Sequence, residues 1–462
     1  MKKIKFTFFD KEKYKKKNGL KFAAPGSKSS TNRRLLILGL SENNPVLENI
    51  LISEDTLIMI NALYDLGVSF KYSADNNQLM KTGNAPPRSR EIYLGYAGTA
   101  YRFLPPYLLG IKGDFRLFGE PELHKRPISE LLDCLNKLIT GKISEDKERG
   151  ITAHIEKIND LNETFIDAER SSQFLTAVLL TFPVLYDNFT INCLKNPASS
   201  YIDLTLSMME KSGVKIEYDN RCKFKINRRQ KYNFSKLNIE GDYSAASYFF
   251  GLSAISGMPV EISNLDYDSK QGDKKFLEFL EKTGCKIRHN SGQNVILITP
   301  PEILKCAGEI DMSKMQDAVP TAAVTAAFAN GETKIVNIGN LKYKECDRFN
   351  AIICELKKIG AAVEYGTDWI SVTGNSEGKD YIPAEIDTYK DHRMAMAFSL
   401  AALKIPGLTV KSPECVCKTF PEFFDSFLPL FENVNLESQN FFSDIFKNQH
   451  LKFKANIIKD YN

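Results

Sequence analysis

The stretch "PGSKSSTNRRLLILGL", residues 25–40, joins a polar beginning to an apolar run, and the same layout recurs along the chain. Small, hydroxyl-bearing or charged residues come first, and an apolar helical pattern follows them. The other copies are "GYAGTAYRFLPPYLLG" (95–110), "ERSSQFLTAVLLTF" (169–182), "GDYSAASYFFGLSAISG" (241–257), "MQDAVPTAAVTAAFANG" (315–331) and "KDHRMAMAFSLAAL" (390–403). Their starts are spaced 71 to 75 residues apart, at Ser27, Gly98, Ser171, Asp242, Asp317 and Asp391. A fixed period of this kind predicts a repeated structural unit.

Glycine residues form a second series with nearly the same period. Each follows a helical pattern and precedes a β-like stretch, a position typical of a helix C-terminal cap. These residues are Gly67, Gly141, Gly213, Gly284 and Gly360. The two series together predict six copies of an α/β unit, each with two helices and a few strands.

The first helix of each unit is predicted to be buried. It is rich in Ala, Leu and Phe and carries few charges, so it is expected to be buried on most sides. Its first residues are Ser, Thr, Gly or Asp, which favour the N-terminal cap. Free backbone N–H groups and the helix dipole attract anions at such ends. We therefore expect these helix starts to converge on an anion-binding cleft.

The chain length and the repeats predict two domains. A chain of 462 residues is too long for one core, and six units divide into two sets of three. We predict an N-terminal lobe of residues 26–240. The C-terminal lobe is predicted to contain residues 1–25 and 241–435. Residues 436–462 form an extension to which no role is assigned.

Composition indicates an ordinary soluble globular protein. The chain is 43% hydrophobic and 26% charged, and its net charge of +4 gives no reason to expect nucleic acid. No apolar run is long enough to span a membrane, and the apolar stretch after "MKK" is too short for a signal peptide. The nine cysteines show no CxxC pair or zinc-like spacing. We expect a cytoplasmic protein without a bound metal.

Charged residues are concentrated beside some of the repeat starts. The first start carries Lys28 and Arg33, the fifth Asp317, and the sixth Arg393. The intervening segments "HKRPISELL", "NLKYKECDRF" and "CKTFPEFF" add further charges. They hold Arg126, Lys344, Glu345, Arg348 and Lys418. Each position is a weak signal alone, but the recurrence of cations beside helix starts predicts a site for anionic substrates.

The set of motifs resembles the 5-enolpyruvylshikimate-3-phosphate synthase family of enolpyruvyl transferases. The matching motifs follow the family order from about residue 20 to about residue 430. They are "PGSKSSTNR", "GTAYRFL", "HKRPI", "SSQFLTA", "EGDYSAASYF", "DAVPTAA", "KYKECDR", "DHRMAM" and "KTFPEFF". The combination of "SSQF", "KECDR", "DHRMA" and "KTFP" is highly specific.

This resemblance implies both a fold and a reaction. The fold is an inside-out α/β architecture of two similar domains, each built from three βαβαββ-type units with buried helices, which close over the substrates. The reaction transfers the carboxyvinyl group of phosphoenolpyruvate to the 5-hydroxyl of shikimate 3-phosphate and releases phosphate, without a cofactor. The resemblance further implies a monomer, no nucleic-acid or membrane partner, and inhibition by glyphosate at the phosphoenolpyruvate position.

Motif positions imply the roles of individual residues. Shikimate 3-phosphate is expected to contact Lys28, Ser29, Arg33, Ser171, Ser172, Gln173, Tyr201, Asp317, Asn340 and Lys344. Phosphoenolpyruvate is expected to contact Lys28, Gly98, Arg126, Gln173, Arg348, Arg393 and Lys418. Acid–base catalysis is expected from Asp317 and Glu345, with assistance from Lys28.

A charge count is consistent with these assignments. Each substrate carries roughly −3 near neutral pH, because the second pKa of a phosphate group is about 6. The implied site holds seven cations and two acids, a surplus of five positive charges. It can therefore neutralise both substrates without a metal. Arginine suits this task because its planar guanidinium group binds carboxylate or phosphate in two places.

Three positions depart from the common family pattern. Tyr96 stands where an Asn usually precedes "AGT", and Phe103 replaces a frequent Pro. Ala198 replaces a serine that is expected to contact substrate, and Ser199 or Ser200 is the candidate substitute.

Other functions remain as alternatives. The sister enzyme that acts on UDP-N-acetylglucosamine shares the repeated fold, but it usually has Asn after the lysine and a cysteine in a catalytic loop. Here Ser29 follows Lys28, and Cys134 lies within a helical pattern. A nucleotide-binding P-loop fails because Ser27, not Gly, precedes the lysine. A non-catalytic anion-binding protein would be expected to lose Asp317 or Glu345.

Overall fold

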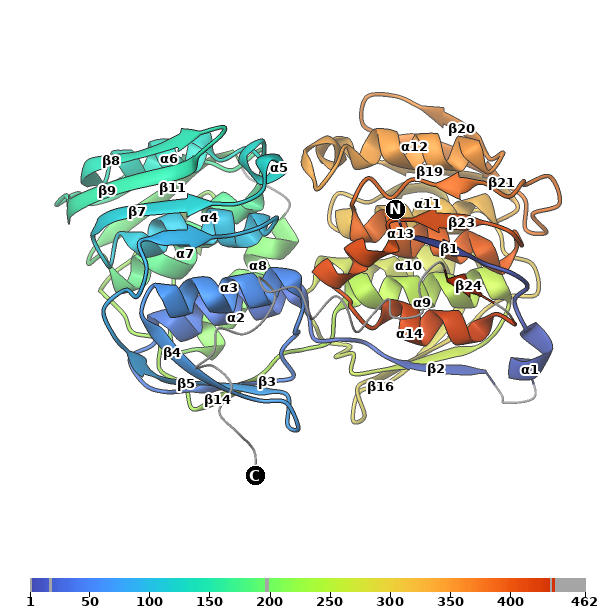
Figure 1. Cartoon of the computed structure of the whole chain (residues 1–462), viewed down its shortest axis with the longest axis horizontal. Coiled ribbons are helices and arrows are strands. Elements are labelled where there is room, and N and C mark those ends of the chain that lie inside the picture. Colours follow the sequence, from blue (N-terminus) through green and yellow to red (C-terminus); the bar gives the residue numbers. More distant parts are fainter. Residues whose placement is uncertain (1, 16–18, 196–198, 433, 437–462) are drawn as a thin grey trace. The chain divides into compact units, whose positions relative to one another are not determined.

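The computed structural model describes residues 2–15, 19–195, 199–432 and 434–436. The described chain forms two compact units (Figure 1). The N-terminal unit runs from Gly26 to Ile239, and the C-terminal unit comprises the described residues up to Pro25 and from Glu240 onward. All but the first residue of the predicted extension 436–462 lies outside the described residues.

The N-terminal unit contains three four-stranded sheets with one shared connectivity. In each sheet the first two strands are parallel. The third strand pairs antiparallel with the second, and the fourth strand pairs antiparallel with the third. The sheet orders are β14 (Lys236–Asn238), β3 (Val46–Glu48), β5 (Gln78–Asn84), β4 (Val68–Ser73); β6 (Glu91–Tyr93), β7 (Gly113–Phe118), β9 (Gly150–Ile158), β8 (Ile139–Asp146); and β10 (Glu163–Asp167), β11 (Phe189–Lys195), β13 (Lys223–Ile226), β12 (Glu217–Asp219).

The C-terminal unit repeats this connectivity in three further sheets. Their orders are β2 (Leu20–Ala23), β15 (Val260–Ser263), β17 (Val295–Thr299), β16 (Lys286–Asn290); β18 (Gly308–Asp311), β19 (Gly331–Val336), β21 (Ile370–Gly374), β20 (Ala362–Tyr365); and β22 (Glu385–Ile386), β23 (Thr409–Lys411), β1 (Lys3–Lys5), β24 (Asn435–Leu436). The predicted α/β fold of six repeated units is confirmed.

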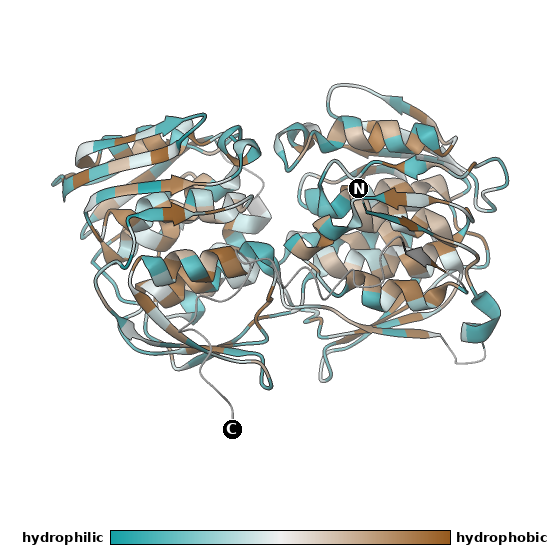
Figure 2. Ribbon diagram, in the orientation of Figure 1, coloured by the Kyte–Doolittle hydropathy of each residue, from teal (hydrophilic) through white to brown (hydrophobic). Residues whose placement is uncertain are grey.

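Three buried helices form the centre of each unit. In the N-terminal unit, α2 (Lys28–Leu40), α4 (Gly98–Leu108) and α7 (Ser172–Thr181) contact one another. In the C-terminal unit the equivalent helices are α9 (Tyr243–Ser256), α11 (Val319–Ala327) and α13 (His392–Ser399). In Figure 2 the inner helices of the C-terminal unit are mostly pale to brown. Every residue of α9 is buried, which confirms the prediction from its composition.

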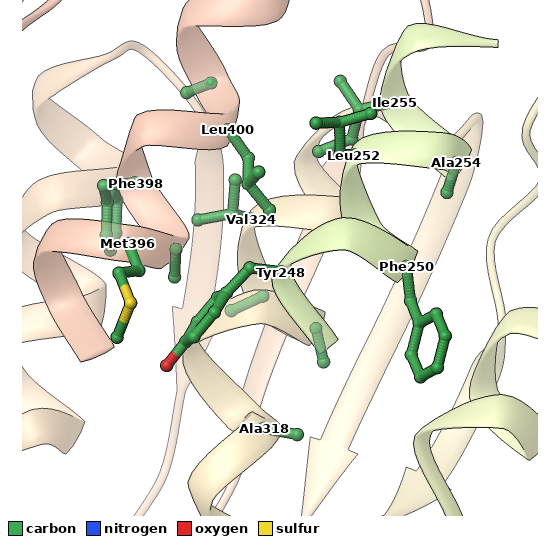
Figure 3. Close-up of a cluster of buried hydrophobic side chains, with 14 of the residues drawn as sticks. Tyr248, Phe250, Leu252, Ala254, Ile255, Ala318, Val324, Met396, Phe398 and Leu400 are labelled. Atoms are coloured by element: carbon green, nitrogen blue, oxygen red, sulfur yellow. The ribbon is translucent and has the colours of Figure 1, made fainter. Parts of the chain in front are cut away.

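Side chains from all three inner helices of the C-terminal unit form a single apolar cluster (Figure 3). Leu400, in the 3-10 turn that follows α13, lies beside Val324 of α11 and near Tyr248 of α9, and Phe398 of α13 belongs to the same buried cluster. Other α-helices complete the two units. They are α1 (Lys11–Lys15), α3 (Glu54–Asp65), α5 (Pro121–His124), α6 (Ser129–Asn136), α8 (Ser199–Lys211), α10 (Phe276–Lys282), α12 (Arg348–Lys358) and α14 (Phe423–Phe427).

Two strands are exchanged where the chain passes from one unit to the other. β2 leads into α2 but pairs with β15, whereas β14 leads into α9 but pairs with β3. In the other four repeats, the strand before the inner helix pairs with the strand after it. The N-terminal strand β1 also pairs with β23 and β24, so an early strand completes a sheet made from late ones.

The predicted repeat starts coincide with the beginnings of the inner helices. Four of them cap the helix with their side chains, which accept backbone N–H bonds of the first turn: Ser27, Ser171, Asp242 and Asp391. Gly98 is the first residue of α4. Asp317 lies in the 3-10 turn η3 (Gln316–Ala318) directly before α11.

The glycine series is confirmed at four positions and wrong at one. Gly67, Gly213, Gly284 and Gly360 follow helices and have positive φ angles between 88° and 107°. Gly141 instead lies inside β8, beside a bulge, because α6 ends earlier at Asn136. Glycine is favoured there for two reasons: its φ is 124°, and a Cβ would overlap the backbone oxygen of a residue in β9.

None of the helices in the described part of the chain is long and apolar enough to cross a membrane.

Candidate active site

The residues implied by the motifs fall into two groups, one in each unit. The N-terminal group contains Lys28, Ser29, Arg33, Gly98, Arg126, Ser171, Ser172, Gln173 and Tyr201. The C-terminal group contains Asp317, Asn340, Lys344, Glu345, Arg348, Arg393 and Lys418. Ala198, the departure from the family pattern, lies outside the described residues.

Arg348 is the centre of the C-terminal group. It is the first residue of α12, and only 1% of it is exposed. Its guanidinium group donates to three carboxylates: Nε to Asp391 at 2.7 Å, Nη1 to Asp317 at 3.0 Å and Nη2 to Glu345 at 2.5 Å. The burial cost of this charge is offset by hydrogen bonds on all sides. The three acids are therefore held in fixed positions around one cation.

Further cations surround the two acids that were predicted to be catalytic. Arg393 Nη2 donates to Oδ2 of Asp317 at 2.9 Å, and Lys344 Nζ lies 3.4 Å from Oδ1 of the same carboxylate. Lys418 Nζ lies 3.8 Å from Oε1 of Glu345. The C-terminal group, apart from Asn340, is thus one connected ion-pair network.

The network determines the charge state of Asp317. Burial raises the pKa of this carboxyl group, but Arg393, Lys344 and Arg348 outweigh burial and hold its pKa well below the usual range. Burial lowers the pKa of Arg348, but Asp391, Glu345 and Asp317 together raise it above its usual value. Asp317 is consequently ionised at neutral pH and can accept a proton but not donate one.

Asn340 lies on the surface in the 3-10 turn η4 (Gly339–Tyr343), shortly before Lys344. The same segment leads into the loop that carries Glu345.

Lys28 begins α2 in the N-terminal unit. Its Nζ lies 3.4 Å from Oδ2 of Asp55, a residue in the first turn of α3 that is only 2% exposed. The partly exposed ammonium group is therefore oriented by a buried carboxylate. Ser29 follows on the same helix turn, beside the backbone N–H groups that make a helix start a site for anions.

Arg33 is positioned from three sides. Its Nε donates to Thr205 Oγ1 at 2.9 Å and its Nη1 to the Ser29 backbone oxygen at 2.9 Å. The guanidinium carbon lies 5.7 Å from the ring centre of Tyr201 and 5.8 Å from that of Phe103. Burial lowers the pKa of Arg33 to about 10, which leaves it charged at neutral pH. The unusual Phe103 therefore packs against a predicted substrate-binding cation.

Gln173 is held by a residue that the motif positions did not single out. Arg102 Nη1 donates to Oε1 of Gln173 at 2.7 Å, and its Nε and Nη2 donate to the Pro127 backbone oxygen at 3.2 and 3.0 Å. Gln173 Nε2 in turn donates to Thr99 Oγ1 at 3.3 Å. Arg102 thus connects α4, α7 and the loop that carries Arg126.

Gly98 and Arg126 are in close contact. A Cβ added at Gly98 would overlap the Arg126 guanidinium group and would lie 3.0 Å from its Nε. The buried Arg126 Nε has no hydrogen-bond partner among the described residues. Glycine at this position therefore makes room for a predicted phosphoenolpyruvate-binding cation, in addition to any room that it makes for a ligand.

The motifs located the charged residues but not the groups that hold them. Asp391 was recognised only as a repeat start, yet it binds Arg348. Asp55 and Arg102 were not predicted at all, because their partners are brought near them by the packing of separate helices. The "DHR" sequence did contain a signal for Asp391, since an acid directly before a helix start both caps the helix and can reach a neighbouring cation.

Among the described residues, no group of three or more His, Cys, Asp or Glu side chains is arranged to hold a metal ion.

Two known enzymes are similar in sequence to this chain over most of its length. The chain is 41% identical over 408 residues to 3-phosphoshikimate 1-carboxyvinyltransferase from Colwellia psychrerythraea, covering 87% of this chain and 94% of the relative. It is 40% identical over 408 residues to the enzyme of that name from Escherichia coli strain SMS-3-5, with the same shares covered.

Solved structures show the same fold. EPSP synthase from Acinetobacter baumannii superposes with a TM-score of 0.75 at 22% identity, covering 95% of this chain and all of that chain. The enolpyruvyl transferase NikO from Streptomyces tendae gives a TM-score of 0.73 at 16% identity, covering 94% of this chain and 99% of that chain. The sequence profile described as EPSP synthase (3-phosphoshikimate 1-carboxyvinyltransferase) matches residues 16–427. The chain therefore belongs to the EPSP synthase family.

Proposed function

We propose that this protein transfers the enolpyruvyl group of phosphoenolpyruvate to the 5-hydroxyl of shikimate 3-phosphate, giving 5-enolpyruvylshikimate 3-phosphate and inorganic phosphate. This is the reaction of the family to which the chain belongs, a step of aromatic amino acid biosynthesis. The observation that supports it most directly is the network around Arg348, where two acids suited to proton transfer lie among four cations suited to anionic substrates.

The N-terminal group is proposed to bind mainly shikimate 3-phosphate. The helix starts that carry Lys28, Ser29, Ser171 and Ser172 offer backbone N–H groups and hydroxyl groups to a phosphate. Arg33 adds a charged donor that Thr205 and two aromatic rings already orient. Little conformational entropy of this side chain is therefore lost when the ligand binds. The other proposed contacts to this substrate are Gln173, Tyr201, Asp317, Asn340 and Lys344.

Phosphoenolpyruvate is proposed to bind the arginine-rich remainder of the site. Its carboxylate and phosphate suit the planar donors of Arg126, Arg348 and Arg393. Lys28, Gly98, Gln173 and Lys418 are the other proposed contacts. Before binding, Arg348 and Arg393 are paired with protein carboxylates, so the ligand must share or replace those pairs.

The addition step requires two proton transfers. The methylene carbon of phosphoenolpyruvate must gain a proton so that C2 becomes electrophilic, and the attacking hydroxyl must lose one. We assign the second step to Asp317, because the surrounding cations keep it ionised. Glu345 is assigned to proton delivery at the methylene, with Lys28 assisting. The tetrahedral adduct then expels phosphate as the methyl group returns a proton.

Both groups of residues are proposed to act on the same pair of substrates, with residues 26–240 and residues 1–25 plus 241–435 as the two functional lobes. Positioning and preorganised charge would supply most of the acceleration, and exclusion of water would protect the activated intermediate. The protein is proposed to act as a monomer, which sedimentation velocity would test.

A phosphate-release assay tests the proposed function. Phosphoenolpyruvate is mixed with the protein and with one acceptor at a time: shikimate 3-phosphate, shikimate or UDP-N-acetylglucosamine. Release is expected only with shikimate 3-phosphate. Release with UDP-N-acetylglucosamine instead would assign the protein to the sister reaction, and no release with any acceptor would favour a non-catalytic anion-binding protein.

A further inference from the structure

Asp273 is a buried carboxyl group next to the Arg348 network but not bonded to it. It lies in the 3-10 turn η2 (Gly272–Lys275), which packs against both α9 and η3, the turn that carries Asp317. Only 5% of Asp273 is exposed. Its Oδ2 accepts the hydroxyl hydrogen of Ser244 at 2.5 Å, while its buried Oδ1 has no hydrogen-bond partner among the described residues.

The surroundings of Asp273 differ from those of the three acids bonded to Arg348. Asp317, Glu345 and Asp391 each form an ion pair with Arg348, whereas no ion pair of Asp273 is found in the described part of the chain. An ionised carboxylate buried with one hydroxyl donor and no bonded cation is costly. The neutral acid would bury no charge, so geometry alone favours a proton on Asp273.

The charged groups that face Asp273, taken together with its burial, also favour a proton on its carboxyl group. They come from three elements: Asp242 at the start of α9, Asp317 in η3 and Arg393 in α13. Burial and the negative charge of Asp317 raise the pKa of Asp273, and Asp242 raises it further. Arg393 and the Ser244 hydroxyl lower this pKa. The net result is a pKa of about 7 for Asp273. The group is thus poised to gain or lose a proton near neutral pH.

We propose that Asp273 takes up a proton when an anionic ligand binds at Arg393, and that this proton strengthens the binding of the ligand. The proposal rests on the proposed function, which assigns Arg393 to phosphoenolpyruvate. A ligand anion adds negative charge beside Asp273, and like charges disfavour the ionised form. The coupling is reciprocal, so a neutral Asp273 removes repulsion and increases ligand affinity. The proton comes from solvent and remains on the carboxyl group, so no covalent bond of the ligand changes.

Calorimetric titration measures this proton directly. Glyphosate is titrated into the protein saturated with shikimate 3-phosphate at pH 8, in HEPES and in Tris, whose different ionisation enthalpies reveal the number of protons bound. Glyphosate is used because it does not turn over. Wild type is expected to take up about 0.5 to 1 proton more than Asp273→Asn, because only the wild-type group titrates. Equal uptake by the two proteins would overturn the proposal.

The pH dependence of kcat/KM for phosphoenolpyruvate supplies a second readout. Above pH about 7 the wild-type value should fall by up to roughly tenfold per pH unit relative to Asp273→Asn, since the required proton becomes scarce. Asp273→Asn, an analogue of the neutral acid, should keep the low-pH value within about threefold. A purely structural role would instead lower activity equally at all pH values, and that result would also overturn the proposal.

Ser244→Ala keeps the proposal testable if Asp273→Asn does not fold. Loss of the hydroxyl donor destabilises the ionised carboxylate, so the fall in kcat/KM should move to higher pH. An unchanged profile in this variant would contradict the coupling. If wild type binds neither glyphosate nor phosphoenolpyruvate, the proposed function fails, whereas binding with equal proton uptake in wild type and Asp273→Asn defeats only this inference.

Discussion

The Nη2 of Arg393 lies 2.9 Å from Oδ2 of Asp317, so a proposed substrate-binding cation is paired with a proposed catalytic base. The pair lies at the starts of two neighbouring inner helices, α13 and α11. This arrangement holds Asp317 ionised and at the same time occupies part of the hydrogen-bonding capacity of Arg393. Catalysis and substrate binding are therefore linked through one contact.

Asp317→Asn should separate these two effects. The amide cannot accept the hydroxyl proton, so kcat is expected to fall by at least about 10²-fold. The KM for phosphoenolpyruvate should stay the same or decrease, because Arg393 is no longer neutralised. Steady-state kinetics check both values, with Asp311→Asn, an exposed acid in β18, as the matched control. A kcat within threefold of wild type would remove Asp317 from the proposed proton transfer.

Glu345→Gln should reduce turnover while leaving phosphoenolpyruvate binding intact. Glutamine keeps the shape of a side chain that contacts Arg348 at 2.5 Å, but it cannot exchange a proton with the substrate. We expect a loss of about 10²- to 10⁴-fold in kcat, measured with Glu364→Gln on the exposed strand β20 as control. Near-normal turnover would show that Glu345 is not needed for the chemistry.

Gly98→Ala should weaken glyphosate inhibition more than it weakens phosphoenolpyruvate binding. The new methyl group overlaps Arg126, so that side chain must move, and a displaced charge-assisted hydrogen bond costs about 1.5 to 3 kcal/mol. Inhibition should be competitive with phosphoenolpyruvate, and the inhibition constant should rise by roughly 10- to 100-fold. Gly110→Ala, near the far end of the same helix, is the control. An unchanged inhibition constant would contradict the packing argument.

Lys81 predicts a pH-dependent stability of the N-terminal unit. This fully buried residue donates to the backbone oxygens of Gly39 and Ser41, at the end of α2 opposite Lys28. Burial lowers the pKa of its ammonium group to about 8. The unfolded chain keeps a pKa of about 10.4, so between these two pH values the unfolded state binds more protons and the free energy of unfolding rises with pH.

Chemical denaturation at several pH values checks this expectation. Relative to Lys81→Met, wild type should gain stability between pH 8 and about 10.4, and the difference should be constant below pH 8. Lys71→Met, at an exposed position on the neighbouring strand β4, should follow wild type. Parallel curves for wild type and Lys81→Met would show that Lys81 is not a buried ammonium group.

The repeated fold could be predicted from sequence because the same physical demand recurs in every unit. A helix buried on all sides needs an apolar sequence and a capped, polar start, and both leave regular marks such as Asp242 before α9. Long-range strand pairing leaves no such mark. Tertiary structure determines the exchange of β2 and β14. It also determines the register of β1 on β23, in which Lys3 lies opposite Lys411. Gly141 was misplaced because a glycine required by a bulge looks like one required by a helix cap.

The site was predictable to the extent that charge is visible in the sequence. Lys344, Glu345 and Arg348 lie within five residues of one another, and their motif located them. Their environment was not predictable, because Asp391 reaches Arg348 from another repeat and Arg102 reaches Gln173 from another helix. Asp273 shows the same limit, since nothing in "KQGDKKF" reveals that its carboxyl group is buried beside Asp317 and Arg393.

Proton NMR of the reaction mixture directly measures the proposed transfer of the enolpyruvyl group to shikimate 3-phosphate. Phosphoenolpyruvate, shikimate 3-phosphate and the protein are combined, and the vinyl signals are followed. The two vinyl protons of phosphoenolpyruvate are expected to disappear while those of a carboxyvinyl ether on the shikimate ring appear, with one phosphate released per ether formed. Persistence of the phosphoenolpyruvate signals, or phosphate release without the new ether, would contradict it.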